Sequence, residues 1–256
     1  MGMELNNLMG FSKIDSTDSI RAILEEQGRL GIDDRRQLRR DINLASKIFQ
    51  IPFDMNMLQN YYYWDNTTLS LVLPLQFYAH ARPRVLEIGP GPAATLSRYI
   101  KKAFISHRVT CAEVDINFAE SAIRSANIQG VEIAVLLSDM TEKINDKFDL
   151  VFMNPPYVTQ SNLSELEIKP GTSEYQAGFG GEQGAEVVEK FLSQVPGVLD
   201  SKGIALLGIN NRYLSDAKVI ELISKSKFFL IKRFYKEDSV PPFSQVYVLS
   251  HEESAS

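Results

Sequence analysis

From Arg84 onward, short apolar runs typical of strands alternate with segments of helical periodicity. Seven of these runs are predicted strands: Arg84–Ile88, Arg108–Val114, Val131–Leu137, Phe148–Met153, Gly203–Ile209, Phe228–Tyr235 and Gln245–Ser250. Helical patterns occupy most of the intervals: Ala93–Lys102, Phe118–Ala126, Gly184–Leu199 and Tyr213–Ser226. This alternation predicts a parallel sheet with helices on both faces. The last two strands are joined through Pro241 and Pro242 without a helix, so they are expected to pair antiparallel.

The first predicted strand ends in a glycine-rich loop, Glu87-Ile88-Gly89-Pro90-Gly91. Glycine allows another molecule to approach the backbone closely, and ligands of open parallel sheets bind at this end of the strands. Taken alone, the loop is equally consistent with an ordinary strand-to-helix turn. The residues that follow the next three strands favour a ligand loop.

Two acidic residues follow the second and third predicted strands. Asp115 comes about 26 residues after the glycine loop, where a carboxylate can accept hydrogen bonds from both hydroxyls of a ribose. Asp139, with Met140 beside it, follows the third strand, where an acid can accept from an exocyclic amine. These residues therefore predict a nucleoside-binding edge of the sheet.

The fourth predicted strand is followed by Asn154-Pro155-Pro156-Tyr157. Two consecutive prolines end the strand and hold the backbone in an extended turn. The Asn154 amide then projects from the edge of the sheet, and the Pro155 carbonyl has no neighbouring donor. Together they can offer two acceptors to one amino group, with Tyr157 as a stacking face. A purely structural turn is more often built from Gly, Asp or Ser.

In this order and spacing, these features resemble the class I S-adenosylmethionine (SAM)-dependent methyltransferases. The Asn-Pro-Pro-Tyr motif resembles that of the branch that methylates planar nitrogens. This branch contains the HemK-type glutamine N5-methyltransferases and the N6-adenine methyltransferases. The spans from Leu136 to Asn154 and from Glu174 to Gly184 resemble the HemK type in particular. The resemblance covers roughly residues 66–250. It implies a Rossmann-like sheet of seven strands, mostly parallel with an antiparallel last strand, and SAM as cofactor.

The resemblance also implies roles for the cofactor-binding residues. Gly89 and Gly91 would let the loop approach the methionine part of SAM, and Glu87 would orient that part or its amine. Asp115 would hold the ribose. Asp139 would accept from the adenine amine.

For the transfer step, the resemblance implies that Asn154, the Pro155 carbonyl and Tyr157 position the attacking nitrogen. The sulfonium carbon is already electrophilic, so the protein mainly has to align donor and acceptor and exclude water. No metal ion and no catalytic histidine or nucleophile is expected.

Three positions differ from the family pattern. Ala93 stands in place of a third loop glycine, and Gln183 stands where the HemK pattern usually has aspartate. Residues 65–68 occupy the place of the family's Pro-Arg-Pro-Glu-Thr segment. The acceptor therefore stays open between a protein glutamine, a small amine and, less favoured, a nucleobase.

Two other classes of function stay open. The main alternative is an enzyme that cyclises SAM itself to azetidine-2-carboxylate and releases methylthioadenosine. Its sulfonium could be caged by aromatic residues at 61–64, Tyr157 and Tyr175. A non-enzymatic SAM-binding module is the other possibility, and the intact Asn154–Tyr157 stretch argues against it.

The chain is predicted to consist of a helical N-terminal extension or lid over residues 1–80 and a SAM-binding catalytic domain over residues 81–256. Helical spacing occurs around Ile20–Leu24, over Asp33–Phe49 and over Thr67–Ala81. The aromatic cluster Tyr61–Trp64 lies where the extension meets the sheet domain. We therefore expect the extension to dock over the SAM site and to form part of its wall.

Composition limits the partners. The chain has 256 residues and a net charge of -5, so no global positive field attracts duplex nucleic acid. It has a single cysteine, Cys111, and its first residues lack a basic region followed by an apolar run. A cytoplasmic protein that contacts no membrane and acts on a small-molecule or protein-side-chain acceptor is the expectation.

Overall fold

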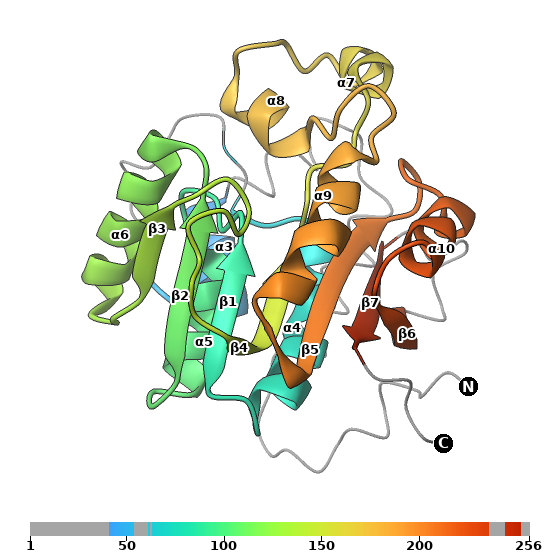
Figure 1. Cartoon of the computed structure of the whole chain (residues 1–256). Coiled ribbons are helices and arrows are strands. Elements are labelled where there is room, and N and C mark those ends of the chain that lie inside the picture. The colour runs from blue at the N-terminus through green and yellow to red at the C-terminus, as the bar shows by residue number, and fades with distance from the viewer. Residues whose placement is uncertain (1–40, 54–60, 62, 236–243, 252–256) are drawn as a thin grey trace.

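The computed structural model describes residues 41–53, 61, 63–235 and 244–251. Within this part of the chain one sheet contains seven strands in the order β3-β2-β1-β4-β5-β7-β6 (Figure 1). The strands are β1 Arg84–Ile88, β2 Arg108–Glu113, β3 Ala134–Leu137, β4 Phe148–Met153, β5 Leu199–Asn210, β6 Phe229–Tyr235 and β7 Ser244–Ser250. The first five strands pair in parallel, and β7 runs antiparallel between β5 and β6. The predicted fold class is confirmed; residues 236–243, which include both prolines of the last connection, lie outside the described residues.

Helices cover both faces of this sheet. They are α3 Ile42–Phe49, α4 Asn66–Ala79, α5 Thr95–Ala103, α6 Ile116–Gln129, α7 Gln160–Glu165, α8 Ser173–Gly178, α9 Glu186–Gln194 and α10 Asp216–Ser224, with a 3-10 turn at Val195–Gly197. Alternate residues of β4 enter different cores, because successive side chains of a strand point to opposite faces. Leu150 and Phe152 pack with α3, α4 and α5, whereas Val151 and Met153 pack with α9 and α10.

The described part of the N-terminal region shares the core of the sheet. Helices α3 and α4 are buried in the same apolar cluster as α5 and strands β1, β4 and β5. The buried Arg98 of α5 connects the two parts, because its guanidinium donates to the Pro52 carbonyl and to the Ala93 carbonyl at 3.1 Å. It also lies over the Phe53 ring, 5.1 Å from its centroid. The predicted helical pattern at Ile20–Leu24 lies outside the described residues.

Two short helices were not predicted from the sequence. Helices α7 and α8 lie in the connection between β4 and α9, above the carboxyl ends of the strands (Figure 1). Each has six residues and begins at a threonine whose hydroxyl caps it, Thr159 for α7 and Thr172 for α8. None of the described helices combines the length and apolar character required to cross a membrane.

Candidate active site

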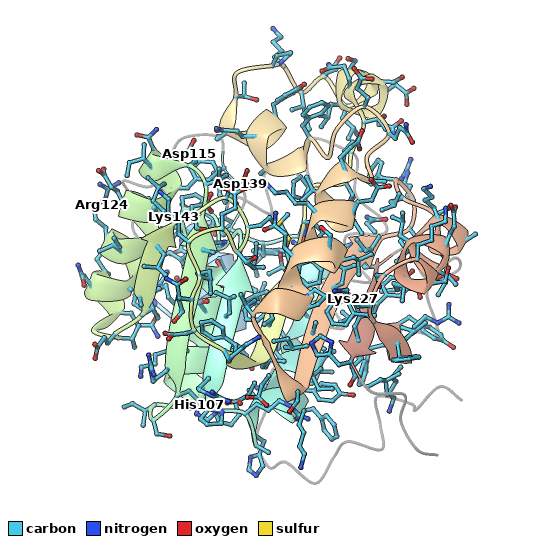
Figure 2. All side chains as sticks on the ribbon, viewed as in Figure 1. His107, Asp115, Arg124, Asp139, Lys143 and Lys227 are labelled. Carbon is cyan, nitrogen blue, oxygen red and sulfur yellow. The ribbon has the colours of Figure 1, made fainter. Side chains whose placement is uncertain are left out.

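A cavity of about 800 Å³ opens at the carboxyl ends of the parallel strands. Its wall combines the ends of β1 to β5 with residues 61–68 and with the segment that carries α7 and α8. Eight of the nine predicted site residues line it: Glu87, Gly89, Gly91, Asp139, Met140, Asn154, Pro155 and Tyr157. Its volume is in the range of ligand pockets. His107, by contrast, lies at the opposite end of the sheet (Figure 2).

The glycine loop needs its glycines for backbone reasons. Gly89 and Gly91 have φ angles of +65° and +63°, in the region that disfavours other residues. A Cβ at residue 91 would also collide with the hydroxyl of Tyr61, which closes over the loop from the N-terminal side. The backbone of this loop is therefore open to close approach, as a ligand cradle requires.

A buried glutamate that was not predicted as a site residue accepts a hydrogen bond from the backbone of the glycine loop. Glu113 ends β2 and is 4% exposed. Its Oε2 accepts from Gly91 N at 3.1 Å, and its Oε1 accepts from Val114 N and Asp115 N at 2.9 and 3.0 Å. Burial raises the pKa of this carboxyl above its usual value, although the hydrogen bonds from the backbone lower it in part. In the sequence, Glu113 could have been recognised as a candidate site residue because it is a charged residue at the end of an apolar run, two positions before Asp115.

Glu87 is a second buried acid in the cavity wall. It is 4% exposed, and its Oε2 accepts from Ser97 N of α5 at 3.0 Å. Burial raises the pKa of Glu87 to about 7, opposed by the hydrogen bonds from Ser97 and reinforced by the charge of Glu113. Around neutral pH this site can therefore exchange a proton for a positively charged ligand.

Binding of SAM, a cation, is accordingly expected to tighten as the pH rises. If the ionised form of Glu87 is the competent one, a pKa near 7 makes the Kd fall by about tenfold between pH 6 and pH 8. Calorimetry across this range measures the effect. The variant Glu87→Gln should bind SAM with little pH dependence, although Glu113 remains. If the Kd of Glu87→Gln for SAM depends on pH as that of the wild type does, another group causes the pH dependence.

Asp115 lies at the rim of the cavity rather than in its wall. It caps α6, because its Oδ1 accepts from Asn117 N at 2.7 Å and from Phe118 N at 3.1 Å. Its Oδ2 accepts from Gln176 Nε2 of α8 at 2.7 Å. Figure 2 shows Asp115 and Asp139 at the same edge of the sheet. A nucleoside held by Asp115 would have to share or displace the Gln176 amide.

We expect Asp115→Ala to weaken SAM binding by about 1.5–3 kcal/mol, the scale for hydrogen bonds to a charged group. The matched variant Asp115→Ser can still cap α6, so it should lose SAM affinity without losing stability. Calorimetry and thermal unfolding separate the two effects. If Asp115→Ala binds SAM as tightly as the wild type, its assignment to the ribose is wrong.

Asp139 is held in an ion pair. Its Oδ2 lies 2.5 Å from Lys190 Nζ of α9, and the same ammonium lies 3.3 Å from Glu142. The next residue, Met140, is buried with φ +51°, an uncommon conformation for a residue with a side chain. Both residues line the cavity, with Lys190 as their neighbour.

Asn154 extends its amide between two elements that are far apart in sequence. Its Nδ2 donates to Oδ1 of Asp65, the N-cap of α4, at 3.1 Å and to Oγ1 of Thr68, in the first turn of α4, at 3.3 Å. Its Oδ1 is buried and has no hydrogen-bond partner among the described residues. Tyr157 belongs to the cavity wall and is 5% exposed, and its hydroxyl lies 2.9 Å from Thr67 Oγ1.

The connection between α8 and α9 packs against the Asn-Pro-Pro-Tyr loop. Val158 N donates to Gly178 O at 2.8 Å, and Gly180 N donates to Val158 O at 3.0 Å. A Cβ at Gly180 would lie 2.5 Å from the Tyr157 Cα, and one at Gly184 would lie 2.6 Å from the Tyr157 carbonyl oxygen. The two glycines let the α8–α9 connection hold the Asn-Pro-Pro-Tyr loop in place.

Described residues near the end of the predicted N-terminal extension belong to the cavity wall. Tyr61, Tyr63 and Trp64 line the cavity, and the Tyr61 ring meets Phe118 edge to face at 5.4 Å. Tyr62 lies outside the described residues. Tyr175 does not belong to the wall; it stacks on Phe179 at 5.1 Å.

Two further buried polar atoms of the wall resemble Asn154 Oδ1 in having no hydrogen-bond partner in the described part of the chain. They are the indole nitrogen of Trp64 and Oδ1 of Asn66. Buried polar groups are nearly always paired. One donor and two acceptors without partners therefore point to a polar ligand in this cavity.

The cavity also fits SAM. The two loop glycines leave the backbone open, and the buried carboxyl groups of Glu87 and Glu113 can complement a sulfonium and an ammonium group. When bound, SAM supplies an activated methyl group.

Comparison with known proteins agrees with this geometry. A family model described as the methyltransferase small domain matches residues 63–168. The chain is 28% identical over 142 residues to the release factor glutamine methyltransferase of Streptococcus pneumoniae, covering 55% of this chain and 50% of that protein. It is 26% identical over 133 residues to the Homo sapiens protein Methyltransferase HEMK2, covering 48% and 57%. The chain thus spans about half the length of these curated relatives.

Among solved structures, a methyltransferase from Pyrococcus furiosus has the same fold, with a TM-score of 0.61 and 20% identity over 85% of this chain and 98% of that chain. The matched domain and the fold are similar to those of class I SAM-dependent methyltransferases, and this likeness indicates SAM as cofactor. The relatives that the chain matches include release factor glutamine methyltransferases and the protein named Methyltransferase HEMK2.

Proposed function

We propose that this enzyme transfers the methyl group of SAM to the side-chain amide nitrogen of a glutamine in a protein substrate. The observation that carries the proposal is Asn154, a residue of the cavity wall whose buried Oδ1 has no hydrogen-bond partner among the described residues. Relatives named as glutamine methyltransferases support the choice of an amide over other planar nitrogens.

The chemistry of an amide explains the need for such an acceptor. The nitrogen lone pair of a carboxamide is conjugated, so the nitrogen is a weak nucleophile. Asn154 Oδ1 and the Pro155 carbonyl can accept its two N–H groups, which favours the pyramidal geometry that develops as the new bond forms.

The other two buried polar atoms without partners, on Trp64 and Asn66, also suit a primary carboxamide. A primary carboxamide has two N–H donors and one carbonyl acceptor. If these residues turn their polar atoms to the substrate, the Trp64 indole N–H can donate to that carbonyl, and Asn66 Oδ1 adds an acceptor. This complement is more specific to an amide than to a simple amine, which has no carbonyl to accept from Trp64.

A product assay tests the proposal. The purified enzyme is incubated with SAM alone and with SAM plus an unmethylated bacterial release factor, and mass spectrometry identifies the nucleoside and any methylated glutamine. We expect S-adenosylhomocysteine to form only with the release factor. Free glutamine and an adenine-containing oligonucleotide serve as competing acceptors, and methylation of either one alone would contradict a protein substrate.

The same assay addresses the cyclisation of SAM. The methyltransferase relatives give that alternative no support, and Tyr175, one of the residues suggested for a sulfonium cage, lies outside the wall. Methylthioadenosine formed from SAM without an acceptor would overturn methyl transfer.

A further inference from the structure

The orientation of the Asn154 amide is fixed by groups outside the Asn-Pro-Pro-Tyr loop. Its nitrogen faces Asp65 Oδ1 at 3.1 Å and Thr68 Oγ1 at 3.3 Å. A carboxylate accepts hydrogen bonds and cannot donate them. The NH₂ group must therefore face Asp65, and the oxygen must face away from it. That oxygen is buried and has no hydrogen-bond partner among the described residues, and Asn154 itself belongs to the cavity wall.

Asp65 is itself held firmly. It is the N-cap of α4, and its Oδ1 accepts from Thr68 N at 2.6 Å and from the Thr68 hydroxyl at 2.7 Å. In return, Asp65 N donates to Thr68 Oγ1 at 3.2 Å. This reciprocal capping box satisfies the helix terminus and leaves the carboxylate little freedom to turn. The same two side chains thus cap a helix and hold the Asn154 amide.

We propose that Asp65 is a positioning residue for the transfer step: it holds the Asn154 amide so that the oxygen, and not the NH₂ group, meets the acceptor nitrogen. The inference rests on the proposed function. Without Asp65, the amide could turn over and present N–H groups to the N–H groups of the substrate. The N-terminal segment would then contribute to the reaction through the first turn of α4, besides forming the cavity wall.

Two substitutions of Asp65 separate positioning from charge. Asp65→Ser keeps an oxygen that can cap α4 but shortens the side chain, which withdraws the acceptor from Asn154. Asp65→Asn keeps an oxygen at the same reach and removes only the charge. We expect kcat with the release factor to fall by about tenfold or more in Asp65→Ser, the scale for one hydrogen bond to a charged group. Asp65→Asn should retain most of the turnover.

A matched control is available in α3. Asp41 is the N-cap of that helix, with its Oδ1 accepting from Asn43 N at 2.9 Å and from Leu44 N at 3.0 Å, and it does not line the cavity. Asp41→Ser therefore measures the cost of changing a helix cap alone. Its turnover should equal that of the wild type.

Two readouts show whether Asp65 acts through Asn154. In the Asn154→Ala background, Asp65→Ser should lower kcat no further, because residues that act through one another are not additive. In the wild-type background, the side-chain NH₂ resonances of Asn154, assigned by their loss in Asn154→Ala, should shift in Asp65→Ser and shift less in Asp65→Asn. The NMR measurement needs no acceptor.

The outcomes distinguish this inference from the proposed function. If the wild type methylates the release factor and Asp65→Ser keeps full turnover, or adds its own loss to Asn154→Ala, the positioning role is wrong and the proposed function stands. If the wild type leaves the release factor unmethylated, the proposed function is wrong. Unshifted Asn154 resonances in Asp65→Ser would overturn the inference in either case.

Discussion

Replacing Asn154 with alanine is expected to lower kcat by roughly a hundredfold or more, the scale for removing one oriented polar group from a transition state. The SAM affinity should stay nearly unchanged, because the amide oxygen is the unpartnered acceptor assigned to the attacking nitrogen. Turnover at saturating SAM and calorimetric SAM binding measure the two quantities separately. A comparable loss in both would mean that Asn154 mainly holds SAM.

Two further variants sharpen this result. Asn127→Ala removes an exposed asparagine from α6 and serves as the matched control, with wild-type turnover expected. Asn154→Asp keeps an acceptor but places a second carboxylate against that of Asp65, which now lies 3.1 Å from the Asn154 nitrogen. Repulsion between the two should displace the side chain, so turnover should also fall. Full turnover in Asn154→Ala would contradict the nitrogen-directed mechanism.

The fold could be predicted because its signals are local. Each parallel strand contains an apolar run, and Gly89 after β1 and Pro155 after β4 mark where two of the loops begin. The start of β5 shows the limit of this information. It begins at Leu199, whereas the apolar pattern begins near Gly203, and the pairing with β4 shifts register over the intervening polar residues. Helices α7 and α8, with six residues each, are too short to show helical periodicity.

The site could be predicted in part, for a geometric reason. The carboxyl ends of parallel strands share one edge, so residues that follow successive strands must lie close together. No such rule places Asp65 beside Asn154, because 89 residues separate them and the contact arises from the packing of α4 on the sheet. Glu113 lies inside the predicted strand Arg108–Val114, and no family motif marks it as the resemblance marks Glu87. Asp115, two residues later, stands where a ribose-binding acid is expected after the second strand.

Replacing Gly180 with alanine is expected to lower turnover by about a hundredfold, although residue 180 carries no reactive group. The added Cβ would lie 2.5 Å from the Tyr157 Cα and 2.8 Å from the Pro156 carbonyl oxygen, whereas ordinary contacts begin at 3.4 Å. Both atoms belong to the backbone, so the Asn-Pro-Pro-Tyr loop or the α8–α9 connection must move by about 1 Å. A displacement of this size at a catalytic group can cost about 100-fold in rate.

The same substitution should have a smaller effect on stability, because inserting one methyl group into a packed region costs about 1–3 kcal/mol. Gly197→Ala is the matched control: it adds the same methyl group at an exposed position with no atom within 4 Å and no positive φ. Thermal unfolding, SAM calorimetry and turnover should be measured for both variants. We expect Gly197→Ala to match the wild type and Gly180→Ala to bind SAM normally but turn over slowly. If Gly180→Ala instead keeps full turnover while folded, the position of the Asn-Pro-Pro-Tyr loop does not depend on its contact with residue 180.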